Sequence, residues 1–272
     1  MDWNKTKTLF IVVFSILNIF LYYLYLDRYT EAENAKFLGS ELSVDEKLKA
    51  DQITYPALPE EDQYEPYINA SMKTFTKSDV PGGNQKVDIA GDRFLTVSYP
   101  KPLPIEDIKS EKLLEEFVAD HAYQGGDYAL WEINAEENKA VFFQIVNGKT
   151  LYYSDNAQVT LYWNDKGEVT HYEQTIFENV QLGEQPKKLI PAISAISTLY
   201  QRGILPSNTQ IDSAEIGYTV YVQVSEDDRM FLPTWHISAT LADGSKEEYF
   251  INAVKDGVIE LQKDEEETEA PQ

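Results

Sequence analysis

The chain has 272 residues and a formal net charge of −23, from 46 Asp and Glu against 23 Lys and Arg. Such an acidic surface repels nucleic acid and anionic lipid headgroups, which excludes nucleic acid as a partner. There is no cysteine, which excludes thiol catalysis and fits a bacterial surface without disulfide chemistry. Hydrophobic residues make up 43% of the chain, so we expect folded structure rather than a disordered acidic polymer.

The first structural signal is an uncharged apolar run from Leu9 to Leu26. As a helix it would be ~27 Å long, close to the ~30 Å hydrocarbon core of a bilayer. Lys5 and Lys7 precede the run and acidic residues dominate after it, so the positive-inside rule places residues 1–8 in the cytoplasm. A cleaved signal peptide would have a shorter run followed by a small-residue cleavage site. We therefore expect a single-pass anchor in the cell membrane and an extracellular C-terminal domain.

One face of this predicted transmembrane helix is polar. Ser15, Asn18, Tyr22 and Tyr25 follow one another at spacings of three, four and three, and so share one side of a helix. An amide in hydrocarbon needs a hydrogen-bonding partner, which a facing helix commonly provides. The alternative is a bond from Asn18 to its own helix backbone. We interpret the four residues as an interface with a partner helix, because a single-span protein has no second helix of its own.

Residues 27–60 are predicted to form a partly helical stalk, with a flexible linker as the alternative. Ser43 and Glu46 have the spacing of a capping box, which opens a short helix. Pro56 and Pro59 follow and prevent the helix from continuing.

From residue 61 onward, strand patterns alternate with two helix patterns. In a first unit, residues 61–154, we predict a helix over 106–121 and a hairpin turn at Asn147-Gly148. The predicted strands of this unit are 67–76, 86–90, 93–99, 127–134, 139–146 and 150–154.

A second unit, residues 155–262, repeats the pattern with a helix over 188–201. Its predicted strands are 158–163, 168–177, 215–224, 231–241 and 247–254. We expect an α+β ectodomain of two tandem units, each an antiparallel sheet with one helix on a face. One large antiparallel sheet with two helices is the alternative. The acidic tail, residues 263–272, is expected to be disordered.

The three histidines show no catalytic pattern in the sequence. Strand alternation separates His236 from its apolar neighbours, with no flanking carboxylate or nucleophile, so we expect an exposed or edge histidine there and at His171. His121 is expected at a helix end, where the dipole favours an imidazolium. Phosphate-loop, nucleophile-elbow and dinucleotide motifs are absent, and lysines interrupt the acidic turns that resemble calcium loops. We predict no catalytic residue, metal site or cofactor, and hence no enzyme.

The opening segment MDWNKTKTLFIVVFSILNIFLYYLYL resembles the start of the YycI (WalI) family. The N-terminal positions that carry the resemblance are Asp2, Trp3, Lys5, Lys7, Thr8 and Asn18. Downstream the resemblance continues at Gly217-Tyr218, Leu232-Pro233-Thr234-Trp235, Asp243-Gly244 and Tyr249-Phe250-Ile251-Asn252-Ala253.

This resemblance implies a regulatory role in the WalK–WalR (YycG–YycF) two-component system of low-GC Gram-positive bacteria, which controls cell-wall metabolism. It implies two partners, a YycH-like sister protein and the sensor histidine kinase WalK (YycG), in a membrane complex formed through the transmembrane helix and the ectodomain, with the kinase contacted through membrane helices. It also implies an α+β ectodomain related to part of YycH, and it provides no catalytic residues. A cell-wall or peptide-binding surface module is the alternative function, because 18 Tyr and 4 Trp allow an exposed aromatic patch.

Overall fold

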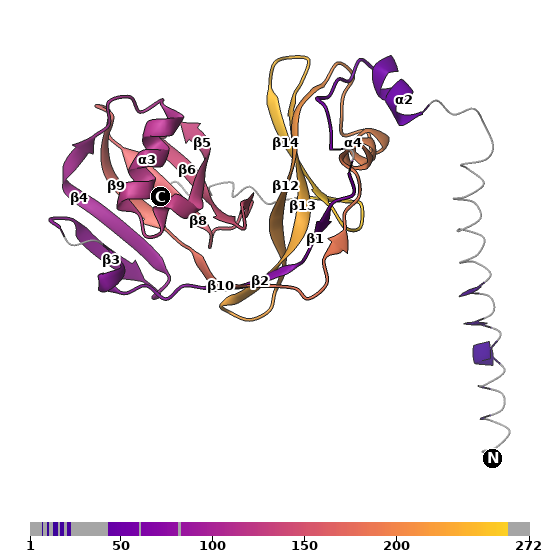
Figure 1. Cartoon of the computed structure of the whole chain (residues 1–272), viewed down its shortest axis with the longest axis horizontal. Helices are drawn as coiled ribbons and strands as arrows, with labels where there is room; N and C mark the ends of the chain where they lie inside the picture. The colour runs from indigo at the N-terminus through magenta and orange to yellow at the C-terminus, as the bar shows by residue number, and fades with distance from the viewer. Residues whose placement is uncertain are drawn as a thin grey trace, which may run out of the picture. The chain divides into compact units, whose positions relative to one another are not determined.

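The computed structural model describes residues 7, 10, 13–15, 17–18, 21–22, 43–59, 61–80 and 83–260. The chain divides into two compact units, Met1–Lys47 and Leu48–Gln272. The described residues between 7 and 22 are helical (Figure 1). Within the described part of the chain, no helix combines the length and the apolarity needed to cross a membrane. Residues 27–42 of the predicted stalk and the predicted disordered tail lie outside the described residues.

Helix α2, Val44–Ala50, begins as its sequence predicts. The Glu46 backbone N–H donates to Ser43 Oγ at 3.3 Å, and the Ser43 backbone N–H donates to Glu46 Oε2 at 2.7 Å. These reciprocal bonds confirm the capping box, in which two N-terminal donors of the helix are satisfied.

The chain after α2 belongs to the second compact unit, which corrects the prediction that the stalk extends to residue 60. Ile53 is buried. Next to it, the Thr54 N–H donates to the Thr209 carbonyl at 3.1 Å, and the Ile211 N–H donates to the Thr54 carbonyl at 2.8 Å. An apolar side chain and paired backbone groups therefore hold this segment in the domain.

The first sheet has the strand order β3-β4-β9-β8-β6-β5, with β7 paired to β6, and all its pairs are antiparallel. The strands are β3 (Lys86–Ala90), β4 (Phe94–Pro104), β5 (Tyr128–Asn134), β6 (Lys139–Val146), β7 (Lys149–Thr150), β8 (Gln158–Trp163) and β9 (Glu168–Gln174). Helix α3, Glu111–His121, lies across one face of this sheet (Figure 1). It buries Leu114, Phe117 and Val118 in a core shared with the strands.

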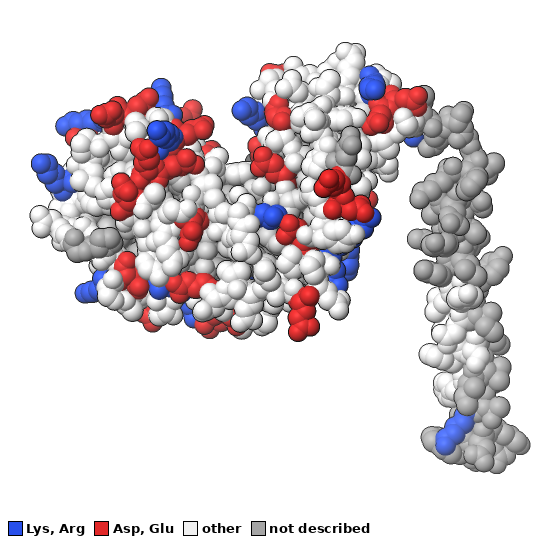
Figure 2. Space-filling model, viewed as in Figure 1, with Lys and Arg blue, Asp and Glu red and all other residues white. Residues whose placement is uncertain are grey.

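The solvent face of α3 is acidic. Red side chains gather over this helix in the space-filling view (Figure 2). The exposed acids of the helix are Glu111, Glu115, Glu116 and Asp120. The helix therefore keeps its apolar stripe on the sheet and its charge in water, as an amphipathic surface helix does.

The second sheet has the order β10-β2-β13-β14-β15, with β12 also paired to β13, and its pairs are antiparallel as well. The strands are β2 (Ile68–Met72), β10 (Phe177–Leu182), β12 (Gln210–Gln223), β13 (Asp228–Thr240), β14 (Lys246–Asn252) and β15 (Gly257–Ile259). Helix α4, Ala192–Gln201, follows a short ladder between β1 (Tyr64–Glu65) and β11 (Lys187–Lys188). The mixed α+β class with antiparallel sheets is thus confirmed.

Sheet membership differs from the predicted division at residues 154/155. Strands β8 and β9, expected in the second unit, pair with β6 and β4 of the first sheet, whereas β2 pairs with β10 and β13 of the second. One reason is that Ile68 of β2 is buried with Phe177 of β10 and Phe231 of β13 in one apolar cluster. Burial of these side chains, and not their order in the chain, decides which strands pair.

The two sheets join where β7 meets β12. Leu151 forms a parallel bridge with Tyr218, and the Tyr152 N–H donates to the Tyr218 carbonyl at 2.8 Å. At the neighbouring Gly217, a Cβ would overlap the Tyr152 ring and lie 2.6 Å from the Thr150 carbonyl oxygen. Glycine therefore permits the close approach of the two backbones.

Candidate functional site

Three of the four residues predicted to face a partner helix lie in described helical segments: Ser15, Asn18 and Tyr22 are all exposed. Lys7 is also described and helical, whereas Lys5 and Tyr25 lie outside the described residues. Asn18 Nδ2 donates to the Phe14 carbonyl at 2.8 Å. This is a bond from Asn18 to its own helix backbone, which sequence analysis gave as the alternative to a bond with a partner helix. It uses one of the two donors of the amide, and the amide oxygen is not part of it.

In the second sheet, His236 is buried, with 7% of its surface exposed. The prediction of an exposed or edge histidine is therefore wrong. Its strand, β13, runs between β12 and β14, and His236 lies opposite Glu215 on one neighbour and Phe250 on the other. A residue at the centre of a sheet is exposed only if nothing covers its face, and here aromatic side chains cover it.

A carboxylate from the adjacent strand binds the buried imidazole. His236 Nε2 and Glu248 Oε2 are hydrogen-bonded, and Ser238 Oγ donates to Glu248 Oε1 at 3.1 Å. Ser238 lies directly opposite Glu248 in the β13–β14 register, and it shares a sheet face with His236 two residues away. Sequence reasoning missed this trio because Glu248 is brought to the site by strand pairing.

Three rings enclose the imidazole. The centroids of Trp131, Tyr152 and Phe250 lie 5.1, 4.8 and 5.1 Å from that of His236, and Phe250 is nearly parallel to it at 19°. Trp131 belongs to β5 of the first sheet, whereas Phe250 belongs to β14 of the second. His236 thus lies where the two sheets meet, and its contacts help to hold them together.

A β-bulge directs Trp131 into this cluster. Leu130 pairs with Phe142 and Glu132 pairs with Val141, which leaves Trp131 as the extra residue of β5. Its ring packs against Phe143 at 5.2 Å, Tyr152 at 5.7 Å and Tyr153 at 5.5 Å between centroids. Bulges re-aim a side chain in this manner, often beside functional sites.

Nearby carboxylates act on two tyrosines of this cluster. Burial raises the pKa of Tyr152, and the nearby carboxylates of Glu215 and Glu248 raise it further. The pKa of Tyr153 is raised by burial and by the charges of Glu248 and Glu132, against the opposing effect of a hydrogen bond with Trp131. Each carboxylate disfavours the formation of a further negative charge on a phenol oxygen.

The trio does not have the order of a hydrolytic triad. In such triads the histidine lies between the nucleophile and the acid, whereas here Glu248 lies between Ser238 and His236. The serine hydroxyl donates to the carboxylate and not to the imidazole, so the histidine is not placed to act as its base. Across the described ranges of the chain, no group of three or more His, Asp or Glu side chains is arranged to hold a metal ion. The arrangement is suited to joining strands and sheets.

The other two histidines also make specific contacts. His171 is half-buried on the interior strand β9 and stacks on Tyr162 at 4.3 Å, so it too departs from the exposed or edge position predicted. Burial lowers its pKa, opposed by the charge of Glu173. His121 ends α3 as predicted, and its Nδ1 donates to the Phe117 carbonyl at 2.9 Å.

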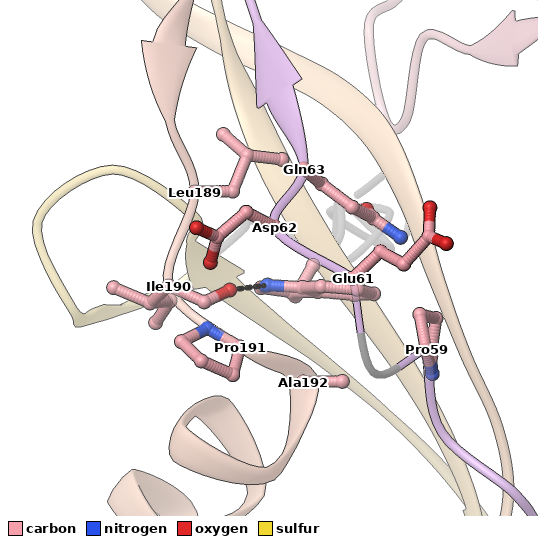
Figure 3. A pocket seen from close by; sticks show the side chains of 9 residues that line it. Pro59, Glu61, Asp62, Gln63, Leu189, Ile190, Pro191 and Ala192 are labelled. Atoms are coloured by element: carbon pink, nitrogen blue, oxygen red, sulfur yellow. Dashed lines mark hydrogen bonds between the residues drawn. The ribbon is translucent and has the colours of Figure 1, made fainter.

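Several hollows adjoin the described residues of the second sheet and of its junction with the first. A small one has a volume of about 30 Å³ and lies beside Trp235, whose indole N–H donates to the Ile190 carbonyl at 2.9 Å (Figure 3). This space suits about one water molecule. A second, lined by Lys149, Glu215 and Trp235 among others, has a volume of about 500 Å³. A third, which we term the Trp131 hollow, has a volume of about 430 Å³. That volume lies within the range of small-ligand sites. Its lining includes Trp131, Glu132, Val141, Phe143, Tyr153 and Asp155.

Comparison with known proteins identifies one family. A family model described as YycI protein matches residues 33–254. The solved structures that are distantly similar include an uncharacterized protein from Eubacterium rectale, at 9% identity and a TM-score of 0.44, with 78% of this chain and 92% of that chain covered. They also include the Bacillus megaterium YpeB C-terminal domain, at 14% identity and a TM-score of 0.41, with 82% of this chain and 100% of that chain covered. No curated protein matches the chain.

Proposed function

Because the chain belongs to the YycI family, whose members are regulatory accessory proteins associated with the WalK system, we propose that it is a non-enzymatic regulator of the sensor histidine kinase WalK (YycG). In this proposal it acts in a membrane complex with the kinase and a YycH-like sister protein. The observation that carries the proposal is the family match over residues 33–254, which takes in nearly all of the described domain.

The arrangement of the histidines supports a binding role over a catalytic one. His236 is hydrogen-bonded to Glu248 and packed against three rings, and His171 is stacked on Tyr162. Histidines used in this way stabilise the domain that would present a surface to partners.

The proposed membrane complex also needs the anchor predicted over residues 9–26, with Lys5 and Lys7 orienting it. We infer that the face formed by Ser15, Asn18, Tyr22 and Tyr25 contacts partner helices. The bond from Asn18 to Phe14 leaves the amide oxygen as an acceptor for such a contact.

Co-purification tests this function. The full chain, tagged at its C-terminus, is extracted with a mild detergent, and mass spectrometry identifies the proteins that accompany it. Recovery of the kinase and the sister protein above an untagged control is expected. If neither is enriched while the chain pellets with purified cell wall, the regulator proposal fails and a wall-binding module takes its place.

A further inference from the structure

Strand β4 departs from its ladder with β9 for four residues. Ser98 is paired with His171. The next pair along the two strands is Leu103 with Val169, so residues 99–102 lie opposite a single residue of β9. Two of these four residues are proline, which fixes φ and provides no backbone donor to the ladder. Bulges of this kind re-aim side chains and are common beside functional sites.

The bulge turns a tyrosine onto the C-terminal end of α3 and leaves a hollow beside it. The Tyr99 ring packs against Phe117 and His121 of the helix, at 6.3 and 6.2 Å between centroids. The hollow, which we term the Tyr99 hollow, has a volume of about 480 Å³, within the range of small-ligand sites. It is lined by Asn84, Gln85, Tyr99, Pro100, Lys101, Leu103 and His121.

The lining of the Tyr99 hollow holds a lysine and no carboxylate. This is unusual in a chain with 46 Asp and Glu. The Trp131 hollow and the hollow beside Lys149 both include acidic residues in their linings. Lys101 is exposed and forms no ion pair with any residue that the structure describes. Its ammonium group is therefore available to a ligand of opposite charge.

The hydroxyl of Tyr99 is a second donor at this site. Burial raises the pKa of Tyr99 to about 12 without a contribution from a neighbouring charge, so the phenol is neutral and can donate. Within the described part of the chain, this hydroxyl makes no hydrogen bond. A partly desolvated polar group without a partner is unfavourable. A ligand with an acceptor atom would provide the missing bond.

His121 provides an acceptor. Its Nδ1 donates to the Phe117 carbonyl at 2.9 Å. Because a neutral imidazole carries its proton on one nitrogen only, Nε2 is left as an acceptor. The ring is stacked on Phe117 at 4.1 Å between centroids, which holds its orientation. The hollow thus has donors for a negatively charged group and an acceptor for an N–H group.

A carboxylate next to an amide N–H matches this set of groups. Ammonium and hydroxyl groups both donate to carboxylate oxygens, and the adjacent N–H can donate to the imidazole. Pro100 and Leu103 provide apolar contacts for an alkyl side chain. An organic cation would be repelled by Lys101, and a phosphate ester has no N–H group for His121.

We propose that the Tyr99 hollow binds the free carboxyl end of a peptide. The terminal carboxylate accepts hydrogen bonds from Lys101 and Tyr99, and the last amide N–H donates to His121 Nε2. The last side chain of the peptide contacts Pro100 and Leu103. This inference goes beyond the proposed regulatory function and does not depend on it.

Histidine-selective NMR of the full chain in a neutral detergent tests the site. The chain has 3 His, and the variant His121→Gln assigns the His121 signal by its loss. The first probe is acetyl-leucine, which carries a carboxylate next to an amide N–H. At constant pH we expect it to shift the His121 signal saturably, more weakly as salt is added. The His171 and His236 signals should not move.

Two matched probes separate the parts of the ligand. Acetyl-leucine methylamide lacks the carboxylate and should leave the His121 signal unchanged. 4-Methylpentanoate keeps the carboxylate and the alkyl group but lacks the N–H, and it should bind several-fold more weakly than acetyl-leucine. Equal binding of 4-methylpentanoate would overturn recognition of a peptide end. Equal shifts with acetyl-leucine and its methylamide, or no saturable shift with any probe, would overturn the proposal altogether.

A matched pair of variants tests the role of charge. Lys101→Gln removes the one lysine of the lining and should weaken binding of acetyl-leucine roughly two- to five-fold, the effect of an exposed ion pair. Lys109→Gln removes the same charge from the loop before α3, outside the lining, and should leave binding unchanged. Both lysines are exposed. Equal binding by the two variants would refute recognition of the carboxylate by Lys101.

Tyr99→Phe tests the hydroxyl separately from the ring. The ring contacts with α3 are kept, and the hydroxyl has no partner among the described residues, so the urea midpoint should be unchanged. Loss of one hydrogen bond to the ligand should weaken binding of acetyl-leucine roughly two- to ten-fold. Binding as tight as in the wild type would show that the Tyr99 hydroxyl does not contact the ligand.

Discussion

His236 and Glu248 lie 12 residues apart on adjacent strands, and their side chains form a hydrogen bond beneath aromatic rings from both sheets. This bond connects the centre of the second sheet to its contact with the first. Removing the carboxylate affects both the buried imidazole and the Ser238 hydroxyl, because each is hydrogen-bonded to Glu248.

We therefore expect Glu248→Ala to lower the free energy of unfolding by ~1–3 kcal/mol, the cost of leaving buried polar groups without a partner. Urea unfolding followed by circular dichroism measures the change. Glu247→Ala is the matched control, since Glu247 is the exposed neighbour on the same strand, and it should change stability by less than ~0.5 kcal/mol. Equal effects would mean that the His236–Glu248 bond contributes nothing to stability.

Alkaline pH should destabilise the domain through its buried tyrosines. Burial raises the pKa of Tyr99 to about 12 and raises those of Tyr128, Tyr152, Tyr172 and Tyr218 further. Below pH ~10 the phenols are neutral in both states; above it the unfolded chain loses protons that the folded chain retains. Stability should then fall with rising pH, by up to ~1.4 kcal/mol per pH unit for each such group.

Denaturant midpoints measured across this alkaline range, together with tyrosinate absorbance, check the prediction. Tyr128→Phe removes one contributor and the bond that its hydroxyl donates to the Thr175 carbonyl at 2.7 Å. It should lower stability at neutral pH yet flatten the alkaline decline. A decline as steep as in the wild type would show that Tyr128 ionises equally in both states.

Gly217→Ala should disrupt the junction of the two sheets. The added methyl would overlap the Tyr152 ring and press on the Thr150 carbonyl, and backbone cannot move aside as a flexible side chain can. We expect a loss of ~1–3 kcal/mol or more. Gly126→Ala is the control, because a Cβ there meets no atom within 4 Å. A Gly217→Ala protein as stable as this control would contradict the close approach.

The domain should need the segment from residue 48 to 60. Leu48 and Ile53 are buried, and each contributes ~1.5–3 kcal/mol when removed from water. A fragment of residues 43–260 should melt cooperatively, and one of residues 62–260 should melt at a clearly lower temperature. If the two fragments have identical melting temperatures by circular dichroism, residues 48–60 do not stabilise the domain and belong to the stalk, as the sequence predicted.

The predicted polar face of the anchor can be tested with Asn18→Leu. This change makes the run more apolar, so insertion should persist, while association with partner helices should weaken by ~0.5–2 kcal/mol. Phe14→Leu is the control, since it keeps the backbone carbonyl that accepts the Asn18 bond. Crosslinking to the kinase and the sister protein at matched expression gives the readout. If the two variants behave alike, the contact runs through the ectodomain.

Local features of this protein follow from its sequence alone. The capping box at Ser43 and Glu46 forms as predicted, and β3, β6 and β8 occupy the predicted residues 86–90, 139–146 and 158–163. Asn147 and Gly148 adopt φ values of 52° and 72°, as a two-residue hairpin turn requires. These features depend on residues that are close together in the chain, so periodicity and capping chemistry predict them from the sequence.

Tertiary structure decided which strands pair and which side chains meet. Alternation along β13 shows that Trp235 and His236 face opposite sides, yet it does not reveal that Trp131 and Glu248 cover His236. Likewise, the apolar pattern of β2 does not show that its partners are β10 and β13. Periodicity reports the environment of each face within one element, whereas the partner on that face is selected by packing between segments distant in the chain.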